Sequence, residues 1–163
     1  MAHFTVGDIA VYQGQGIGRI TDISTMEVAG ASLEFYTVHM DSGTIVRVPT
    51  HKADDVGLRS PIDPQDVPAV YGILKADADR PVDKTWNRRY RAYSEKLRSG
   101  SVEDLAQVTR DLYRLQDGKD LSFGERQMLE QARNLLVKEL SLATRRDEGE
   151  IAQEIEAVFA VDL

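Results

Sequence analysis

The stretch SPIDPQDVP, residues 60–68, separates two parts of the chain that have different hydrophobic periodicities. Its prolines, Pro61, Pro64 and Pro68, indicate a linker followed by the start of a helix, because proline lacks a backbone N–H and is best accepted in a first helical turn. Before this stretch the apolar residues alternate, and after it they recur with helical spacing. We therefore expect an α+β protein of two domains, residues 1–60 and 61–163.

The part before the linker is expected to form a small β-barrel. The β-rich runs IAVY, GRITDIST, LEFYTVHM and TIVRVP are separated by turns that contain glycine. The last two runs are joined by Asp41-Ser42-Gly43, which predicts a hairpin. Four or five short strands in so short a segment predict a bent barrel of the SH3 or Tudor kind. In the final strand, either Ile45 with Arg47 or Val46 with Val48 can face the core.

The part after the linker is expected to be a compact all-α domain of about five helices. Ser122 and Glu125 have the spacing of a capping box, and Asp147 can cap the last helix. The apolar stripes of four of these helices have i, i+3, i+4 spacing. They are Val67–Leu74, Leu105–Leu115, Met128–Leu140 and Ile151–Phe159. The fifth helix is expected at TWNRRYRAY.

The bulk composition is that of a soluble globular protein. The 163 residues are 42% hydrophobic and 29% charged, with a net charge of −7. The absence of cysteine excludes disulfides, thiolate catalysis and thiolate-bound zinc. No run approaches the ~18 apolar residues that a membrane span requires, and the N-terminus does not resemble a signal peptide. We therefore expect a cytoplasmic protein.

Nothing in the sequence favours an enzyme or a cofactor site. The histidines, His3, His39 and His51, are far apart and have no partner at metal-ligand spacing. The run GQGIG, residues 14–18, begins like a dinucleotide fingerprint, but a second strand rather than a helix is expected after it. Those glycines therefore indicate a tight turn. Most carboxylates lie at expected helix starts, where they complement the helix dipole.

The segment TWNRRYRAY, residues 85–93, places the only tryptophan of the chain among three arginines. On a helical wheel one side carries an aromatic and apolar stripe, with arginines opposite it and flanking it. The stripe consists of Trp86, Tyr90, Tyr93 and Leu97, with Arg88 and Arg91 opposite and Arg89 flanking. Two interpretations remain open at this point. Either Trp86 begins a buried stripe, or it contacts DNA at the positive end of the helix, beside cations that hold phosphates.

With these segments in view, the chain resembles the CarD/CdnL group of bacterial transcription regulators that bind RNA polymerase. The likeness extends over nearly the whole length, and the order and spacing of its motifs make it specific. They are VGDIAVYQGQGIGRI, TIVRVP, VGLR, TWNRRYRAYSEKLRSGSVEDLAQVTRDLY, LSFGERQMLEQAR and LLVKELSLA. No basic, AT-hook-like tail is present, so the chain is most similar to the short CdnL form.

The resemblance implies a non-enzymatic factor with two contact surfaces. Residues 1–60 would be a Tudor-like domain that binds the RNA polymerase β subunit by pairing strands. Residues 61–163 would be a helical domain that contacts promoter DNA near the −10 element and hinders collapse of the transcription bubble. The implied polymerase-binding residues are Ile45, Val46, Arg47, Val48 and Pro49. The implied DNA-binding residues are Trp86 as a wedge and Arg88, Arg89, Arg91 and Arg126 as backbone contacts.

The resemblance also defines what is not expected. It implies no cofactor, no metal, no membrane and no small-molecule substrate. It implies a place in the bacterial cytoplasm, at the nucleoid through RNA polymerase. Met26 departs from the family pattern, because some relatives carry a basic residue at that position.

The alternative to a polymerase-binding factor is a Tudor-type reader of methyl-lysine peptides with a helical annex. Tyr12, Phe35 and Tyr36 would then be the walls of an aromatic cage. Phe35 and Tyr36 are neighbours on one expected strand, so their side chains point to opposite faces of the sheet. That geometry weakens a shared cage.

Overall fold

The computed structural model describes residues 3–76, 86–99, 101–116 and 121–160. The chain divides into two compact units, Met1–Pro61 and Ile62–Leu163. The first unit is built from strands and the second from helices. The predicted α+β fold class is confirmed.

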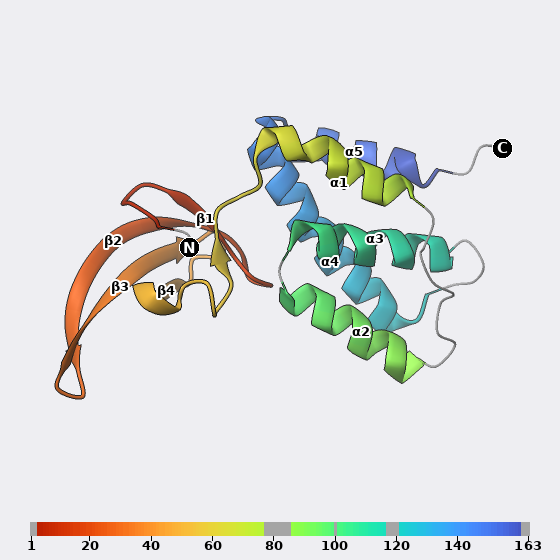
Figure 1. The fold of residues 1–163 in the computed structure, drawn as a ribbon. Coiled ribbons are helices and arrows are strands. Elements are labelled where there is room, and N and C mark those ends of the chain that lie inside the picture. The colour runs from red at the N-terminus through yellow and green to blue at the C-terminus, as the bar shows by residue number, and fades with distance from the viewer. Residues whose placement is uncertain (1–2, 77–85, 100, 117–120, 161–163) are drawn as a thin grey trace. The chain divides into compact units, whose positions relative to one another are not determined.

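The first unit is one antiparallel sheet in which strands that follow one another along the chain are mostly neighbours (Figure 1). Its strands are β1 (Ile9–Tyr12), β2 (Gly16–Val28), β3 (Ala31–Met40), β4 (Ile45–Pro49) and β5 (Leu58–Arg59). The order across the sheet is β4-β3-β2-β1-β5, and the short 3-10 helix η1 (Thr50–Lys52) lies between β4 and β5 along the chain. Sheet order and 3-10 turn are those of a small SH3-like or Tudor-like fold.

The turn between β3 and β4 confirms the predicted hairpin. The N–H of Gly43 donates to the carbonyl oxygen of Met40 at 2.9 Å, and the N–H of Met40 donates to that of Thr44 at 2.8 Å. Gly43 has φ of +92°, a conformation that glycine adopts without steric cost. In the segment Asp41-Ser42-Gly43, the glycine therefore permits the turn, because it can adopt this positive φ.

The core of the first unit decides which face of each strand is buried. Tyr36 and Val38 of β3 lie in it together with Val48 of β4, and Val46 packs against them. Ile45 is 56% exposed, and Arg47 is also exposed. Of the two alternating sets in the last hairpin strand, Val46 with Val48 is therefore the one that faces inward.

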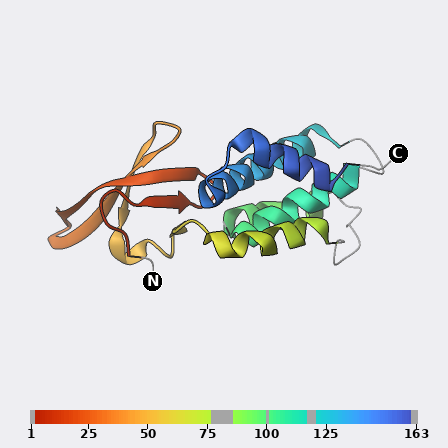
Figure 2. The same cartoon turned by 90° about the horizontal axis from the view of Figure 1, so that it is seen from above.

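The second unit consists of five helices after the short 3-10 helix η2 (Pro64–Asp66) in the part of the chain that is described. They are α1 (Val67–Lys75), α2 (Trp86–Ser99), α3 (Val102–Gln116), α4 (Phe123–Thr144) and α5 (Glu148–Val158). Helix α3 packs against α1, α2 and α4, and α5 packs against α4 (Figure 2). None of the described helices is both long and apolar enough to span a bilayer.

The helix starts follow the predicted capping chemistry. The Ser122 hydroxyl accepts from the N–H of Glu125, and the Glu125 carboxylate accepts from the N–H of Ser122, each at 3.2 Å. Asp147 accepts from the N–H of Gly149 at 3.0 Å and so caps α5. These bonds satisfy N–H groups that a helix start leaves without an internal partner. Both predicted caps are confirmed.

Candidate functional site

The first candidate surface is the outer edge of β4. This strand pairs with β3 on one side only, and no strand in the described part of the chain covers its other side. We call this side, formed by the backbone of Ile45, Arg47 and Pro49, the open strand edge. The sequence-predicted residues Ile45–Pro49 make up the whole of β4.

Register determines which backbone groups point out of the open strand edge. Because Met40 N–H bonds to Thr44, alternation makes Val38–Val46 and Tyr36–Val48 the hydrogen-bonded pairs. Ile45 and Arg47 therefore direct their N–H and C=O groups away from β3. Pro49 contributes only its C=O, because proline has no N–H. An edge of this kind is a template for an added strand.

The same alternation directs the side chains of β4 to two faces of the sheet. Val46 and Val48 anchor the strand to the core, whereas Ile45 and Arg47 present an apolar chain and a cation to solvent. Met26 is also exposed but lies opposite Leu33, beyond the part of β3 that pairs with β4. A strand added to β4 would therefore lie beside Arg47. It would reach Met26 only if the bound protein also covered the far ends of β2 and β3.

The structure is inconsistent with the aromatic cage of a methyl-lysine reader. Tyr36 is 4% exposed, and its hydroxyl accepts from the N–H of Phe4 at 3.3 Å. The rings of Phe4 and Tyr36 meet edge to face, with centroids 5.5 Å apart. Phe35 is half-buried on the other face of β3. Tyr36 is thus a core residue and cannot form a wall with Phe35.

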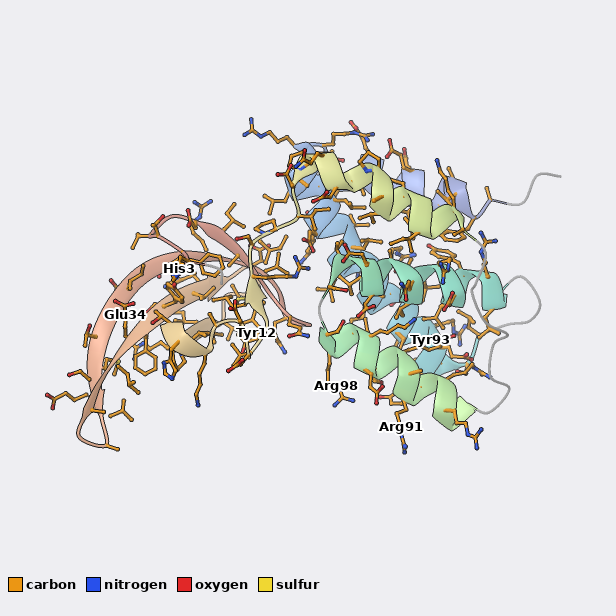
Figure 3. All side chains as sticks on the ribbon, in the orientation of Figure 1. His3, Tyr12, Glu34, Arg91, Tyr93 and Arg98 are labelled. Atoms are coloured by element: carbon orange, nitrogen blue, oxygen red, sulfur yellow. The ribbon has the colours of Figure 1, made fainter. Side chains whose placement is uncertain are left out.

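The second candidate surface lies where α2 and α4 begin. Trp86 is the first residue of α2, and its side chain lies outside the described part of the structure. Arg88 and Arg91 are exposed. Figure 3 shows Arg91 and Arg98 projecting away from the other helices, while Tyr93 points toward them. The described arginines Arg88 and Arg91 thus lie on the outer side of α2, as predicted from the helical wheel.

Arg89 is placed differently from the expectation of a phosphate contact. It is 6% exposed, and its Nη2 lies 3.2 Å from Oε2 of Glu125, which is 2% exposed. Tyr90, expected in the buried stripe, is 48% exposed. The buried side of α2 is thus rotated from the aromatic stripe toward Arg89. The reason is that α4 supplies a carboxylate opposite that position, and a helical wheel cannot show what lies opposite.

Glu125, for which the sequence predicted only a capping role, also pairs with Arg89. Its burial alone would raise its pKa, but hydrogen bonds from Ser122 and the charge of Arg89 outweigh burial and lower the pKa below the ordinary value. The carboxylate therefore stays ionised at neutral pH. One side chain both caps α4 and binds α2. The missing signal was spatial, because Arg89 and Glu125 are 36 positions apart.

The first turn of α4 adds an exposed cation and an exposed ring. Arg126 is exposed, and Phe123 is 69% exposed. The Arg89–Glu125 pair brings this turn to the start of α2. We call the set of Arg88, Arg91 and Arg126 the arginine edge. Two helix starts meet beside it, and each contributes the positive end of a helix dipole.

Besides the two candidate surfaces, the described residues carry a groove but no metal site. No group of three or more His, Asp or Glu side chains within the described ranges is arranged to hold a metal ion. A groove of about 680 Å³ lies between α1 and α5, lined mainly by apolar residues with Lys75 and Glu154. Two of its polar groups are engaged within the fold, since the hydroxyl of Tyr71 donates to Glu154 at 2.7 Å.

Two family models match the chain, one on each unit. The model described as CarD-like/TRCF RID domain matches residues 4–62. The model described as CarD, C-terminal domain, matches residues 69–156. Together they span both candidate surfaces.

The chain is also similar to a curated relative and to two solved N-terminal domains. YdeB of Bacillus subtilis (strain 168), described as a candidate transcription factor, is 30% identical over 141 residues, covering 85% of this chain and 91% of YdeB. The solution structure of the 72-residue N-terminal domain of Myxococcus xanthus CarD is 38% identical, covers 37% of this chain and 84% of that chain, and has a TM-score of 0.32. The structure of the N-terminal CdnL fragment from the same organism is 39% identical, covers 37% of this chain and 86% of that chain, and has a TM-score of 0.31.

Proposed function

Because the chain belongs to the CarD/CdnL family of transcription factors, we propose that its first unit binds the RNA polymerase β subunit and its second unit stabilises the promoter open complex by contacting DNA. The supporting observation is that two compact units each carry a surface of distinct chemistry. These are the open strand edge and the arginine edge. The first unit matches a domain shared with TRCF, the transcription-repair coupling factor, whose RID is an RNA polymerase interaction domain.

The open strand edge supports binding by strand addition. Ile45 and Arg47 direct backbone donors and acceptors outward, and backbone bonds of this kind give affinity with little dependence on sequence. Arg47 then selects the partner by charge, because a carboxylate beside it on the added strand would form a cross-strand pair. Pro49 ends the pairing, since it has no N–H to donate. We propose Ile45–Pro49 as the polymerase contact.

The arginine edge supports contact with the DNA backbone. Arg88, Arg91 and Arg126 are exposed within the first two turns of α2 and α4, and the dipoles of these helix starts add to the attraction that cations exert on phosphate. Trp86 begins the helix that carries two of them, and we propose that its ring wedges into the minor groove at the upstream edge of the bubble. Arg89 is not proposed as a phosphate contact, because its guanidinium is buried against Glu125.

The magnitudes fit a factor that stabilises rather than recruits. Stacking of one aromatic side chain is worth ~1–3 kcal/mol per base. A change of about 1.4 kcal/mol is tenfold in an equilibrium constant, so one ring alters a bubble equilibrium measurably. A few phosphate contacts alone give weak binding that is sensitive to salt. Tethering to polymerase raises the local DNA concentration and makes such contacts effective.

The test is whether the purified chain co-elutes with bacterial RNA polymerase and prolongs the life of a promoter open complex after a competitor is added. Arg47→Glu should weaken co-elution without changing the far-ultraviolet circular dichroism. Lys52→Glu, the same charge change at an exposed position on η1, should leave co-elution unchanged. No co-elution, or equal co-elution of both variants, would remove the open strand edge from the polymerase contact.

A further inference from the structure

The ion pair between Arg89 and Glu125 links the starts of two helices that each carry part of the arginine edge. Arg89 lies one residue after Arg88, and Glu125 lies one residue before Arg126. The 3.2 Å contact therefore joins the backbone segments from which those two exposed cations project. Fixing Arg89 against Glu125 fixes the separation of the two segments.

Stability alone does not account for this pair. Removing two charges from water is costly, and buried ion pairs are often no more stabilising than apolar residues of similar size. The same two helices already contribute Tyr93, Leu97, Met128 and Leu129 to the apolar core. An ion pair differs from an apolar contact in being specific for one geometry. A guanidinium and a carboxylate bond only within narrow limits of distance and angle, whereas apolar side chains pack in many arrangements.

Glu125 is constrained from both sides, which makes it a rigid anchor. Its Oε1 accepts from the backbone N–H of Ser122 and its Oε2 accepts from Arg89. The carboxylate thus cannot follow Arg89 without breaking the cap of α4. Pairing with Arg89 also offsets a negative charge that would repel phosphate beside Arg126.

We propose that Arg89 and Glu125 are positioning residues that hold the starts of α2 and α4 in one register, so that Arg88, Arg91 and Arg126 contact the same stretch of DNA backbone together. This inference rests on the proposed function. It assigns Arg89 to the support of the DNA contact rather than to the contact itself. Without the pair, the two helices would still fold but would present their cations independently.

The test uses the full-length chain with Arg89→Met and Glu125→Gln combined. Glutamine at the third position of a helix preserves a capping box, and methionine fills the space of the arginine stem without its charge. The measurement is open-complex lifetime against salt concentration. Each phosphate contact that is lost should lower the log-log salt slope by about 0.9. We expect the double variant to lose at least one contact while co-elution with polymerase remains unchanged.

A masking experiment separates positioning from a structural effect. In the native chain, Arg126→Ala should lower the salt slope by about 0.9. In the Arg89→Met, Glu125→Gln background the same change should have no effect, because Arg126 no longer reaches the backbone together with α2. A matched control combines Arg133→Met with Glu156→Gln, which removes another 3.2 Å ion pair, between α4 and α5. In that background Arg126→Ala should retain its full effect.

The outcomes distinguish this inference from the proposed function. If Arg88→Ala and Arg126→Ala leave the slope of the native chain unchanged, the proposed DNA contact itself is wrong. If they lower it, but the combined variant keeps the native slope and the native effect of Arg126→Ala, the positioning role is wrong. Glu125→Gln alone serves as the second variant if the combined change reduces helical content. Retention of the native slope by a folded Glu125→Gln protein would also contradict the inference.

Discussion

The two candidate surfaces differ in which atoms they offer to a partner. The open strand edge offers backbone N–H and C=O groups of Ile45 and Arg47, whose positions follow from pairing with β3. The arginine edge offers side-chain cations on two helices, whose positions follow from packing and from one buried ion pair. Backbone pairing is short-ranged and little affected by salt, whereas phosphate contacts weaken steeply as salt rises. We therefore expect salt to weaken binding through the arginine edge of the second unit and to have little effect on binding through the open strand edge of the first unit.

The largest expected effect comes from blocking the backbone of the open strand edge. Ile45→Pro removes an outward N–H and places a ring in the path of an added strand, while the bonds of β4 to β3 remain. A lost hydrogen bond with an unpaired group left behind costs about 1–3 kcal/mol, so polymerase binding should weaken by up to roughly a hundredfold. Binding measured at two salt concentrations checks this prediction.

The matched control for Ile45→Pro is Ile45→Thr, which keeps the N–H and suits a strand. It should bind nearly as well as the native chain. Equal weakening by both substitutions would mean that the side chain rather than the backbone makes the contact, and the comparison of the two surfaces would lose its basis.

The next largest effect is expected from replacing Trp86, whose role is predicted from the sequence. Trp86→Ala should shorten open-complex lifetime by about tenfold, from the ~1–3 kcal/mol of one stacked ring, and should alter thermal stability by about 1 kcal/mol or less. Because Trp86 is the only tryptophan, its fluorescence in the free protein should be red-shifted and quenched by iodide. A blue-shifted, unquenched signal with a large loss of stability would identify Trp86 as a core residue instead.

A smaller effect is expected from the exposed arginines of α2. Arg88→Ala with Arg91→Ala should lower the salt slope of open-complex lifetime by about 0.9 for each contact, uniformly across promoter sequences. The control pair is Lys138→Ala with Arg145→Ala, cations toward the opposite end of α4 from Arg126. An unchanged slope in the first variant would mean that these arginines are only a solvated face.

The smallest effect is the pH dependence of the Arg89–Glu125 pair. The pKa of Glu125 is lowered in the folded state, so its contribution to stability is fully present above the unfolded value, near 4.5, and is lost as pH falls through the folded pKa. The difference in melting temperature between the native chain and Glu125→Gln should shrink over that range. A difference that grows on acidification would contradict the assignment of a lowered pKa.

The sequence predicted the secondary structure better than the identity of the buried residues. The turn at Asp41–Gly43 and the caps at Ser122 and Asp147 are local, because each involves residues a few positions apart. Such interactions form in nearly the same way whatever surrounds them. The choice between the two faces of β4 required the core, since alternation in that strand is compatible with either face.

At the candidate sites the same division holds. The segment at β4 was singled out by the family resemblance. The outward side of α2 could be identified from residue type and spacing, because an amphipathic helix has a periodic pattern. The roles of Arg89 and Tyr90 could not. Spacing around α2 favoured Tyr90 as buried and Arg89 as a flanking cation, and the structure reverses them.

The sequence by itself therefore determined the two kinds of architecture, the hairpin, the caps and the family resemblance, because these depend on periodicity and on contacts between near neighbours. Only the tertiary structure decided that β4 is an edge strand, that Val46 and Val48 face inward, and that Arg89 is buried. The physical reason is that burying an unpaired guanidinium is costly, so its burial depends on a carboxylate beside it. That carboxylate, Glu125, comes from another helix, and its distance from Arg89 is a property of packing rather than of sequence.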